Sequence, residues 1–207
     1  MKIAILSIQH TGTWFTIEAL KRLTGFPCQL SSDYEAGYPL VHCHVYANGE
    51  TEGRIKDMDH PDIWHAITHF SDRGYKIVIP LRDPLASIIT RHNRHSNLSH
   101  RYLPESFEEL SRVNPSLYFP FPIDLHRNDE DRQRLAQNMC SYLGIQYKPI
   151  SWRKVQSAAD VSGLRTDYER MDITRIIESL GQYHKLLKDS KGWQAMYKQL
   201  GYKFWWI

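Results

Sequence analysis

Short apolar runs alternate with amphipathic stretches along the first half of the chain. Continuous apolar runs, which are typical of strands buried on both faces, lie at residues 2–7, 40–45 and 76–81. Apolar positions at helical spacing predict a helix after each run, over residues 13–23, about 61–70 and about 85–95. Since strands that alternate with helices pair in parallel through right-handed crossovers, the pattern predicts an α/β fold.

The second half of the chain has a looser pattern. The apolar segment 117–123 contains Pro120 and Pro122, so we expect an edge strand or an extended segment there. Further helices are predicted over residues 107–112, 129–143, 171–180 and 193–200, and residues 28–39 are expected to form a loop. No repeat or linker interrupts the chain, so residues 1–207 are expected to form a single domain.

Composition narrows the class of protein. The hydrophobic share of 42% and the charged share of 24% are ordinary for a globular protein, and a net charge of +3 is too small to indicate a nucleic-acid partner. The three cysteines are widely spaced and lack a C-x-x-C pair, which is typical of reduced intracellular thiols. No apolar run is long enough for a signal peptide or a membrane span. We therefore expect a cytoplasmic protein. The sequence does not indicate its oligomeric state.

The first strand is followed by a loop that resembles a phosphate-binding loop. Residues 7–13 read SIQHTGT, which nearly fits G-x-x-x-x-G-K-[ST], with Ser7 at the first glycine and Thr13 at the lysine. Gly12 would let the backbone approach an anion, and the N-terminus of the following helix would supply N–H donors. The missing lysine argues against an ordinary Walker ATPase or a kinase.

The second strand carries two histidines on one face. Alternation places His42 and His44 together, with Cys43 on the opposite face. Such a pair could bind a metal, could form a catalytic base with its partner, or could be polar residues of a strand end.

The third strand is followed by a candidate phosphate clamp. Arg82 lies at the strand end, and Asp83-Pro84 begins a helix that carries Ser87 and Thr90 one and two turns later. The alternative is an ion pair of Arg82 with a nearby carboxylate, Asp83 or Asp124.

Taken in chain order, these three motifs resemble those of the sulfotransferases that use 3′-phosphoadenosine 5′-phosphosulfate (PAPS). Residues 10–15, HTGTWF, resemble the family's 5′-phosphosulfate loop K-S-G-T-T-W, and residues 42–44, HCH, resemble its K-T-H strand end. Arg82 and Thr90 have the spacing of its 3′-phosphate motif, and residues 139–155 resemble a downstream stretch. The resemblance covers about residues 1–95 and, more loosely, 130–155. It implies a three-layer P-loop-like fold with a central, mainly parallel sheet flanked by helices.

The resemblance also implies an activity and a set of site residues. The expected reaction is in-line transfer of the sulfuryl group of PAPS to a hydroxyl or amine of a small-molecule or carbohydrate acceptor, without a metal. His44 would be the catalytic base, while His10 and His42 replace family lysines and would stabilise developing charge. The expected nucleotide-binding residues are His10, Thr11, Gly12 and Thr13 for the 5′-phosphate, Trp14 or Phe15 for adenine, and Arg82 with Thr90 or Ser87 for the 3′-phosphate.

Two other functions fit the same residues. A zinc enzyme could use His10, His42 and His44 as ligands. A non-catalytic nucleotide-binding or scaffold protein could have the same fold after loss of the lysine. The C-terminal aromatic residues, among them Trp193 and Tyr202, are expected to be docking groups more often than the lining of an acceptor pocket.

Overall fold

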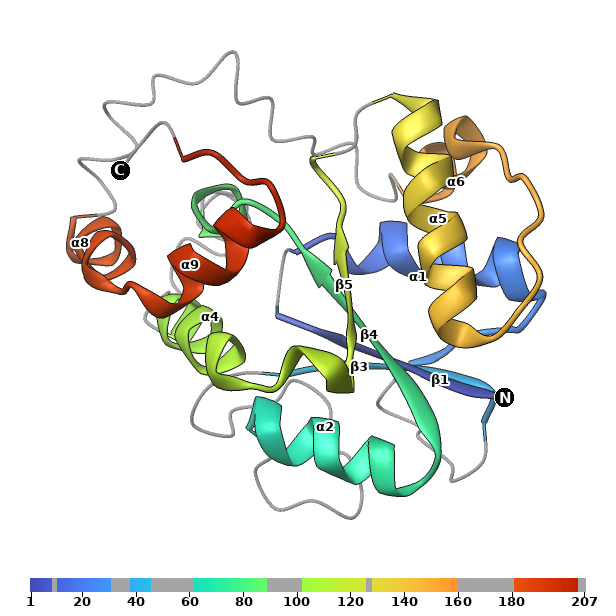
Figure 1. Cartoon of the computed structure of the whole chain (residues 1–207), viewed down its shortest axis with the longest axis horizontal. Coiled ribbons are helices and arrows are strands. Elements are labelled where there is room, and N and C mark those ends of the chain that lie inside the picture. Colours follow the sequence, from blue (N-terminus) through green and yellow to red (C-terminus); the bar gives the residue numbers. More distant parts are fainter. Residues whose placement is uncertain are drawn as a thin grey trace.

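One parallel sheet organises the molecule. The computed structural model describes residues 1–8, 11–30, 38–45, 62–88, 102–125, 128–159 and 181–204. The strands are β1 (Lys2–Ser7), β2 (Gln29–Leu30), β3 (Leu40–His44), β4 (Tyr75–Leu81) and β5 (Phe119–Pro122). Their order is β2-β3-β1-β4-β5, and every neighbouring pair is parallel (Figure 1). The α/β prediction is therefore confirmed.

Helices cover both faces of the sheet and make three layers (Figure 1). One face is covered by α1 (Thr13–Thr24), α5 (Asp129–Leu143) and α6 (Trp152–Ala159). The other is covered by α2 (Ile63–Asp72), α4 (Tyr102–Arg112), α8 (Gln182–Asp189) and α9 (Gly192–Gln199). The connection from β1 to β2 and the one from β3 to β4 run in opposite directions, so right-handed crossovers place α1 and α2 on opposite faces.

The apolar and proline residues of each strand explain its place in the sheet. β1 is central, and all its residues after Lys2 are buried, as expected for a continuous apolar run. β5 is an edge strand, as its prolines predicted, because a proline cannot donate to a second neighbour. The helix predicted over 129–143 ends at Gly144, which adopts a left-handed conformation with φ of 73°.

Some boundaries differ from those expected. The loop predicted over 28–39 is wrong at Gln29–Leu30, because these residues pair with β3 as a strand too short to show alternation. Helix α4 begins at Tyr102, earlier than predicted, and a 3-10 turn at Pro115–Leu117 precedes β5. Residues 84–88 are helical as predicted, whereas residues 89–95 and the helix expected over 171–180 lie outside the described residues.

The C-terminal aromatic residues that the structure describes are docking groups. Trp193 is fully buried and Tyr202 nearly so, within the core beneath α4 and α9. Across the described ranges, no helix has the length and hydrophobicity needed to cross a bilayer. The single-domain organisation stays a prediction.

Candidate active site

The carboxyl ends of β1 and β3 are the expected place for a ligand. The chain leaves these adjacent strands in opposite directions, and parallel sheets bind ligands where such connections diverge. In the strand register Ser7 lies opposite His44, and Ile5 lies opposite His42. The loop before α1 and the paired histidines are thus brought together, as the sequence predicted for neighbouring strand ends.

Helix α1 begins without a cap. Gly12 precedes it in a left-handed conformation with φ of 95°, no side chain caps the helix, and its first turn contains no acidic residue. A Cβ at residue 12 would overlap the Cδ1 atom of Ile123, which follows β5. Glycine is therefore required both by the backbone conformation and by the close approach of the neighbouring segment.

The threonine hydroxyls of this loop point into the protein. The Thr11 hydroxyl donates to the carbonyl oxygen of Ile8 at 2.6 Å, and the Thr13 hydroxyl donates to Oγ of Ser7 at 2.9 Å. Within the described residues, the backbone N–H groups of residues 13–15 have no hydrogen-bond partner. An anion at this point would thus meet backbone donors and the positive end of the helix dipole.

Ser7 joins the two histidines to the start of α1. Its Oγ lies 2.9 Å from Nε2 of His42 and 3.1 Å from Nδ1 of His44. The two imidazole rings meet edge to face, with centroids 4.6 Å apart. Ser7 was expected only as a substitute for a glycine. Its register opposite His44 is the signal that could have revealed this role.

The hydrogen-bond network assigns the histidine tautomers. Nδ1 of His44 also lies 3.3 Å from the carbonyl oxygen of Ser7, which can only accept, so this nitrogen carries the proton. Oγ of Ser7 accepts from Thr13 and from His44, so its own hydrogen goes to Nε2 of His42. In the neutral His44 ring the lone pair is consequently on Nε2, the atom that a general base needs.

His42 is a neutral member of this cluster. Burial, and secondarily the neighbouring His44, lower the pKa of His42 well below its ordinary value. At neutral pH it therefore carries no charge. It can orient Ser7, but it cannot supply the positive charge that the resemblance to the sulfotransferases led us to expect at this position.

The Arg82 loop is held at the start of the next helix. Oδ1 of Asp83 accepts from the backbone N–H of Leu85 at 2.8 Å and from that of Ala86 at 3.4 Å. Ser87 is fully buried, and its hydroxyl donates to the Asp83 carbonyl at 3.3 Å, so it faces the core. His10 and Thr90 lie outside the described residues.

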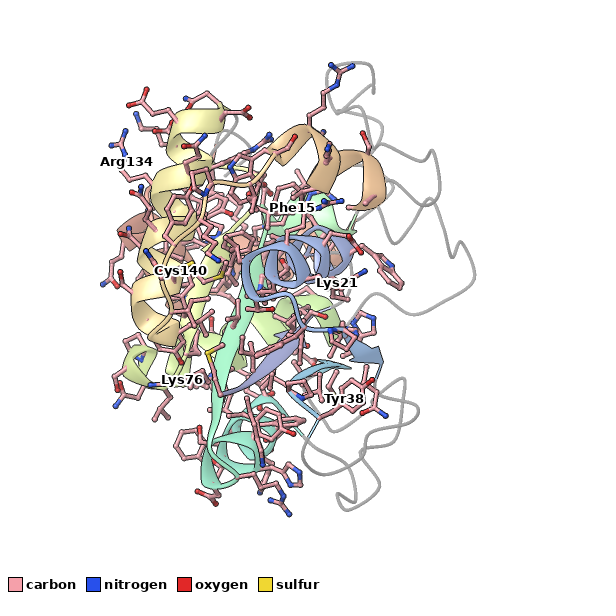
Figure 2. The ribbon with its side chains drawn as sticks, turned by 90° about the vertical axis from the view of Figure 1, so that its right-hand side faces the viewer. Phe15, Lys21, Tyr38, Lys76, Arg134 and Cys140 are labelled. Atoms are coloured by element: carbon pink, nitrogen blue, oxygen red, sulfur yellow. The ribbon has the colours of Figure 1, made fainter. Side chains whose placement is uncertain are left out.

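The two candidate adenine-stacking residues occupy different environments. Phe15 packs against Trp152, with ring centroids 5.8 Å apart, and the Arg132 guanidinium lies 5.8 Å from the Phe15 ring centre. Figure 2 shows Phe15 where α1 approaches the layer of α5 and α6. Trp14, by contrast, is 46% exposed. Phe15 anchors α1 to the core, and Trp14 is the aromatic side chain that a base could contact.

The zinc alternative stays a hypothesis, because His10, one of its three ligands, lies outside the described residues. They contain no group of three or more histidine, cysteine or acidic side chains that could hold a metal ion. His42 and His44 both direct a ring nitrogen at Ser7.

Comparison with known proteins supports the fold. Neither a family model nor a curated protein matches the sequence. Among solved structures, the crystal structure of mouse sulfotransferase SULT7A1 complexed with PAP matches with a TM-score of 0.55, covering 96% of this chain and 88% of that chain. The two chains share a fold. At 10% sequence identity the match confirms the P-loop-like α/β architecture, while the roles of individual residues stay predictions.

Proposed function

We propose that this protein is a sulfotransferase that transfers the sulfuryl group of PAPS to a hydroxyl group of an acceptor. The observation that carries the proposal is the hydrogen-bonded path from the uncapped start of α1 to a base. Thr13 donates to Ser7, and Ser7 contacts His44, at the carboxyl edge of a sheet that has the fold of a PAP-bound sulfotransferase. Arg82 directly follows β4, the strand on the other side of β1.

The nucleotide is held mainly by backbone donors and one arginine. The N–H groups of residues 13–15 bind the 5′-phosphate, and Trp14 stacks on adenine. Arg82 binds the 3′-phosphate through its planar guanidinium group. For His10 and Thr90 the expected contacts with the two phosphates remain predictions from the sequence.

His44 supplies the base. Its Nε2 accepts the proton of the acceptor hydroxyl while the acceptor oxygen attacks sulfur in line with the breaking bond to the 5′-phosphate. Negative charge then grows on the leaving phosphate oxygen, where the N-terminus of α1 stabilises it. Neutral His42 keeps Ser7, and through it the His44 ring, in one orientation.

Selective binding of 3′,5′-adenosine bisphosphate tests the proposal. In calorimetric titrations the wild type should bind the bisphosphate and not ADP with magnesium. Arg82→Ala should weaken binding at least about tenfold, the size of a lost charge-assisted contact. Arg134→Ala is the matched control, because this arginine on α5 is exposed and points away from the body of the molecule (Figure 2). Binding of ADP with magnesium, or of neither nucleotide, would contradict the proposal.

The neutral state of His42 favours one alternative, a nucleotide-binding protein without turnover. It would bind the bisphosphate as above but release none from PAPS in the presence of a mixture of phenols, sugars and amines. Turnover with any of these acceptors excludes it.

A further inference from the structure

Asp124, the second residue after β5, joins the C-terminal segment to the Arg82 loop. Its Oδ1 accepts the hydroxyl hydrogen of Tyr202 at 2.5 Å, and its Oδ2 accepts the backbone N–H of Asp83 at 2.9 Å. Both carboxylate oxygens are thus engaged, one by a residue beyond α9 and one by the residue after Arg82.

The peptide group on the other side of Arg82 is held by the same residues. The Leu81 carbonyl oxygen accepts the Ile123 N–H at 3.0 Å and lies 3.3 Å from the Tyr202 hydroxyl. The backbone is therefore held on both sides of Arg82. The preceding carbonyl contacts Ile123 and Tyr202, and the following N–H donates to Asp124. This arrangement fixes the direction in which the Arg82 side chain leaves the backbone.

The same segment also meets the loop before α1. Ile123 packs so closely on Gly12 that no Cβ fits there. Residues 123 and 124 thus connect the backbone donors at α1 with the arginine at the end of β4. The spacing between the two proposed phosphate contacts depends on these residues.

Tyr202 is suited to act as a permanent donor. It is 5% exposed and packs against Tyr197, with ring centroids 4.8 Å apart. Burial first, and then the charge of Asp124, raise the pKa of Tyr202 far above its ordinary value, so the hydroxyl stays protonated. Its bond to the carboxylate is of the strong, charge-assisted kind.

We infer that Tyr202 and Asp124 are positioning residues that hold Arg82 in the geometry needed to recognise the nucleotide 3′-phosphate. The inference rests on the proposed function. It assigns to the C-terminal segment, which is far from the nucleotide motifs in sequence, a role in distinguishing a 3′-phosphorylated nucleotide from one without that group.

The test compares two ligands and two tyrosine variants. Tyr202→Phe removes only the hydroxyl, and Tyr118→Phe is the matched control, since its buried hydroxyl donates to Sδ of Met196 in the same aromatic cluster. Calorimetry with 3′,5′-adenosine bisphosphate and with adenosine 5′-monophosphate gives a ratio of affinities. Tyr202→Phe should lower bisphosphate affinity about tenfold and leave monophosphate affinity unchanged, and Tyr118→Phe should change neither.

A double-mutant cycle separates positioning from general destabilisation. In an Arg82→Ala background, Tyr202→Phe should have no further effect on the ratio, because the group that it positions is absent. Asp124→Asn, which keeps the shape of the side chain, should reproduce the selective loss and serves if Tyr202→Phe does not fold. A Tyr202→Phe variant that weakens both ligands equally, or matches Tyr118→Phe, would overturn the inference while wild-type bisphosphate binding upheld the proposed function. A wild type that does not bind the bisphosphate would refute both.

Discussion

Helices α1 and α5 cover the same face of the sheet but begin in opposite ways. α5 is capped by Asn128, whose side chain accepts the Asp131 N–H at 2.8 Å, and its first turn contains three acidic residues, Asp129, Glu130 and Asp131. α1 begins at a left-handed glycine, with no side-chain cap and no acid. The α5 pattern satisfies the donors and dipole of the helix from within the chain. The α1 pattern leaves the donors of residues 13–15 without a partner among the described residues, and we propose that a ligand phosphate binds them.

Because α1 has no side-chain cap, other contacts must stabilise it. A missing cap costs a helix about 1 kcal/mol, so α1 is held instead by its buried face and by the packing of Phe15 on Trp152. Beneath its start lies the hydrogen-bonded group of Ser7, Thr13 and the two histidines. At the start of α5 the Asn128 side chain itself accepts a backbone N–H of the first turn.

The largest effect is expected from a change at His44, the proposed base beneath α1. His44→Ala should reduce turnover about a thousandfold, the usual contribution of general-base catalysis, and should leave bisphosphate affinity within about twofold of the wild type. Initial rates with PAPS and an acceptor, together with calorimetry, measure the two quantities. Loss of both would show that His44 holds the nucleotide and does not act as the base.

Gly12→Ala should damage α1 far more than the corresponding change damages α5. It adds a Cβ against Ile123 at a positive φ, so we expect a loss of about 2–4 kcal/mol in unfolding free energy and of more than tenfold in bisphosphate affinity. Gly144→Ala, at the end of α5, also has a positive φ but open space around it. It should cost roughly 1 kcal/mol and leave affinity unchanged. Denaturant unfolding and calorimetry that gave similar results for both variants would contradict the account.

Giving α1 an acid of the kind found in α5 should stabilise the helix and weaken bisphosphate binding. Trp14→Glu places a carboxylate in the exposed first turn, which should add about 0.5 kcal/mol of stability. It should also lower bisphosphate affinity about tenfold more than Trp14→Gln, which removes only the ring. The two variants would have equal affinities if no phosphate lies at the start of α1. The reciprocal change, Asn128→Ala, should cost about 1 kcal/mol and leave binding intact.

The smallest effect concerns the pH dependence of stability. Because the pKa of His42 is lowered in the folded protein, the unfolded chain binds a proton that the folded protein does not. The contribution of neutral His42 to the free energy of unfolding is complete above the ordinary histidine pKa. It declines as the pH falls below that value, by at most about 1.4 kcal/mol per pH unit. Urea unfolding between pH 7.5 and 5.5 should show a shallower slope for His42→Gln than for the wild type. An unchanged slope would mean that His42 does not resist protonation in the folded state.

The sequence predicted the parts of the fold that have strong periodicity. The strands at residues 2–7, 40–44 and 75–81 are central, buried runs, and α5 has both a cap and a stop signal. β2 could not be predicted, since two residues show no alternation and only pairing with β3 defines them. The helices α6 and α8 were not identified, although α9, which has the same length of eight residues, was.

For the candidate site, the sequence indicated which residues are candidates but not where their side chains point. It predicted that the end of β3 lies beside the loop after β1, and parallel register does place His44 opposite Ser7, five residues before Gly12. It could not decide between Trp14 and Phe15, since one residue along a helix turns a side chain by about 100°. Tertiary packing buries Phe15 against Trp152 and leaves Trp14 exposed, and it likewise turns the Thr11 hydroxyl inward and brings Tyr202 to Asp124.

The most direct test follows backbone amides during a nucleotide titration. In nitrogen-15 NMR spectra of the labelled protein, adding 3′,5′-adenosine bisphosphate should shift the amide signals of residues 13–15 saturably. The amides of residues 129–131 at the capped start of α5 should not move. Saturable binding that leaves the signals of 13–15 in place, or shifts both helix starts alike, would contradict the claim that the uncapped N-terminus of α1 binds the nucleotide phosphate.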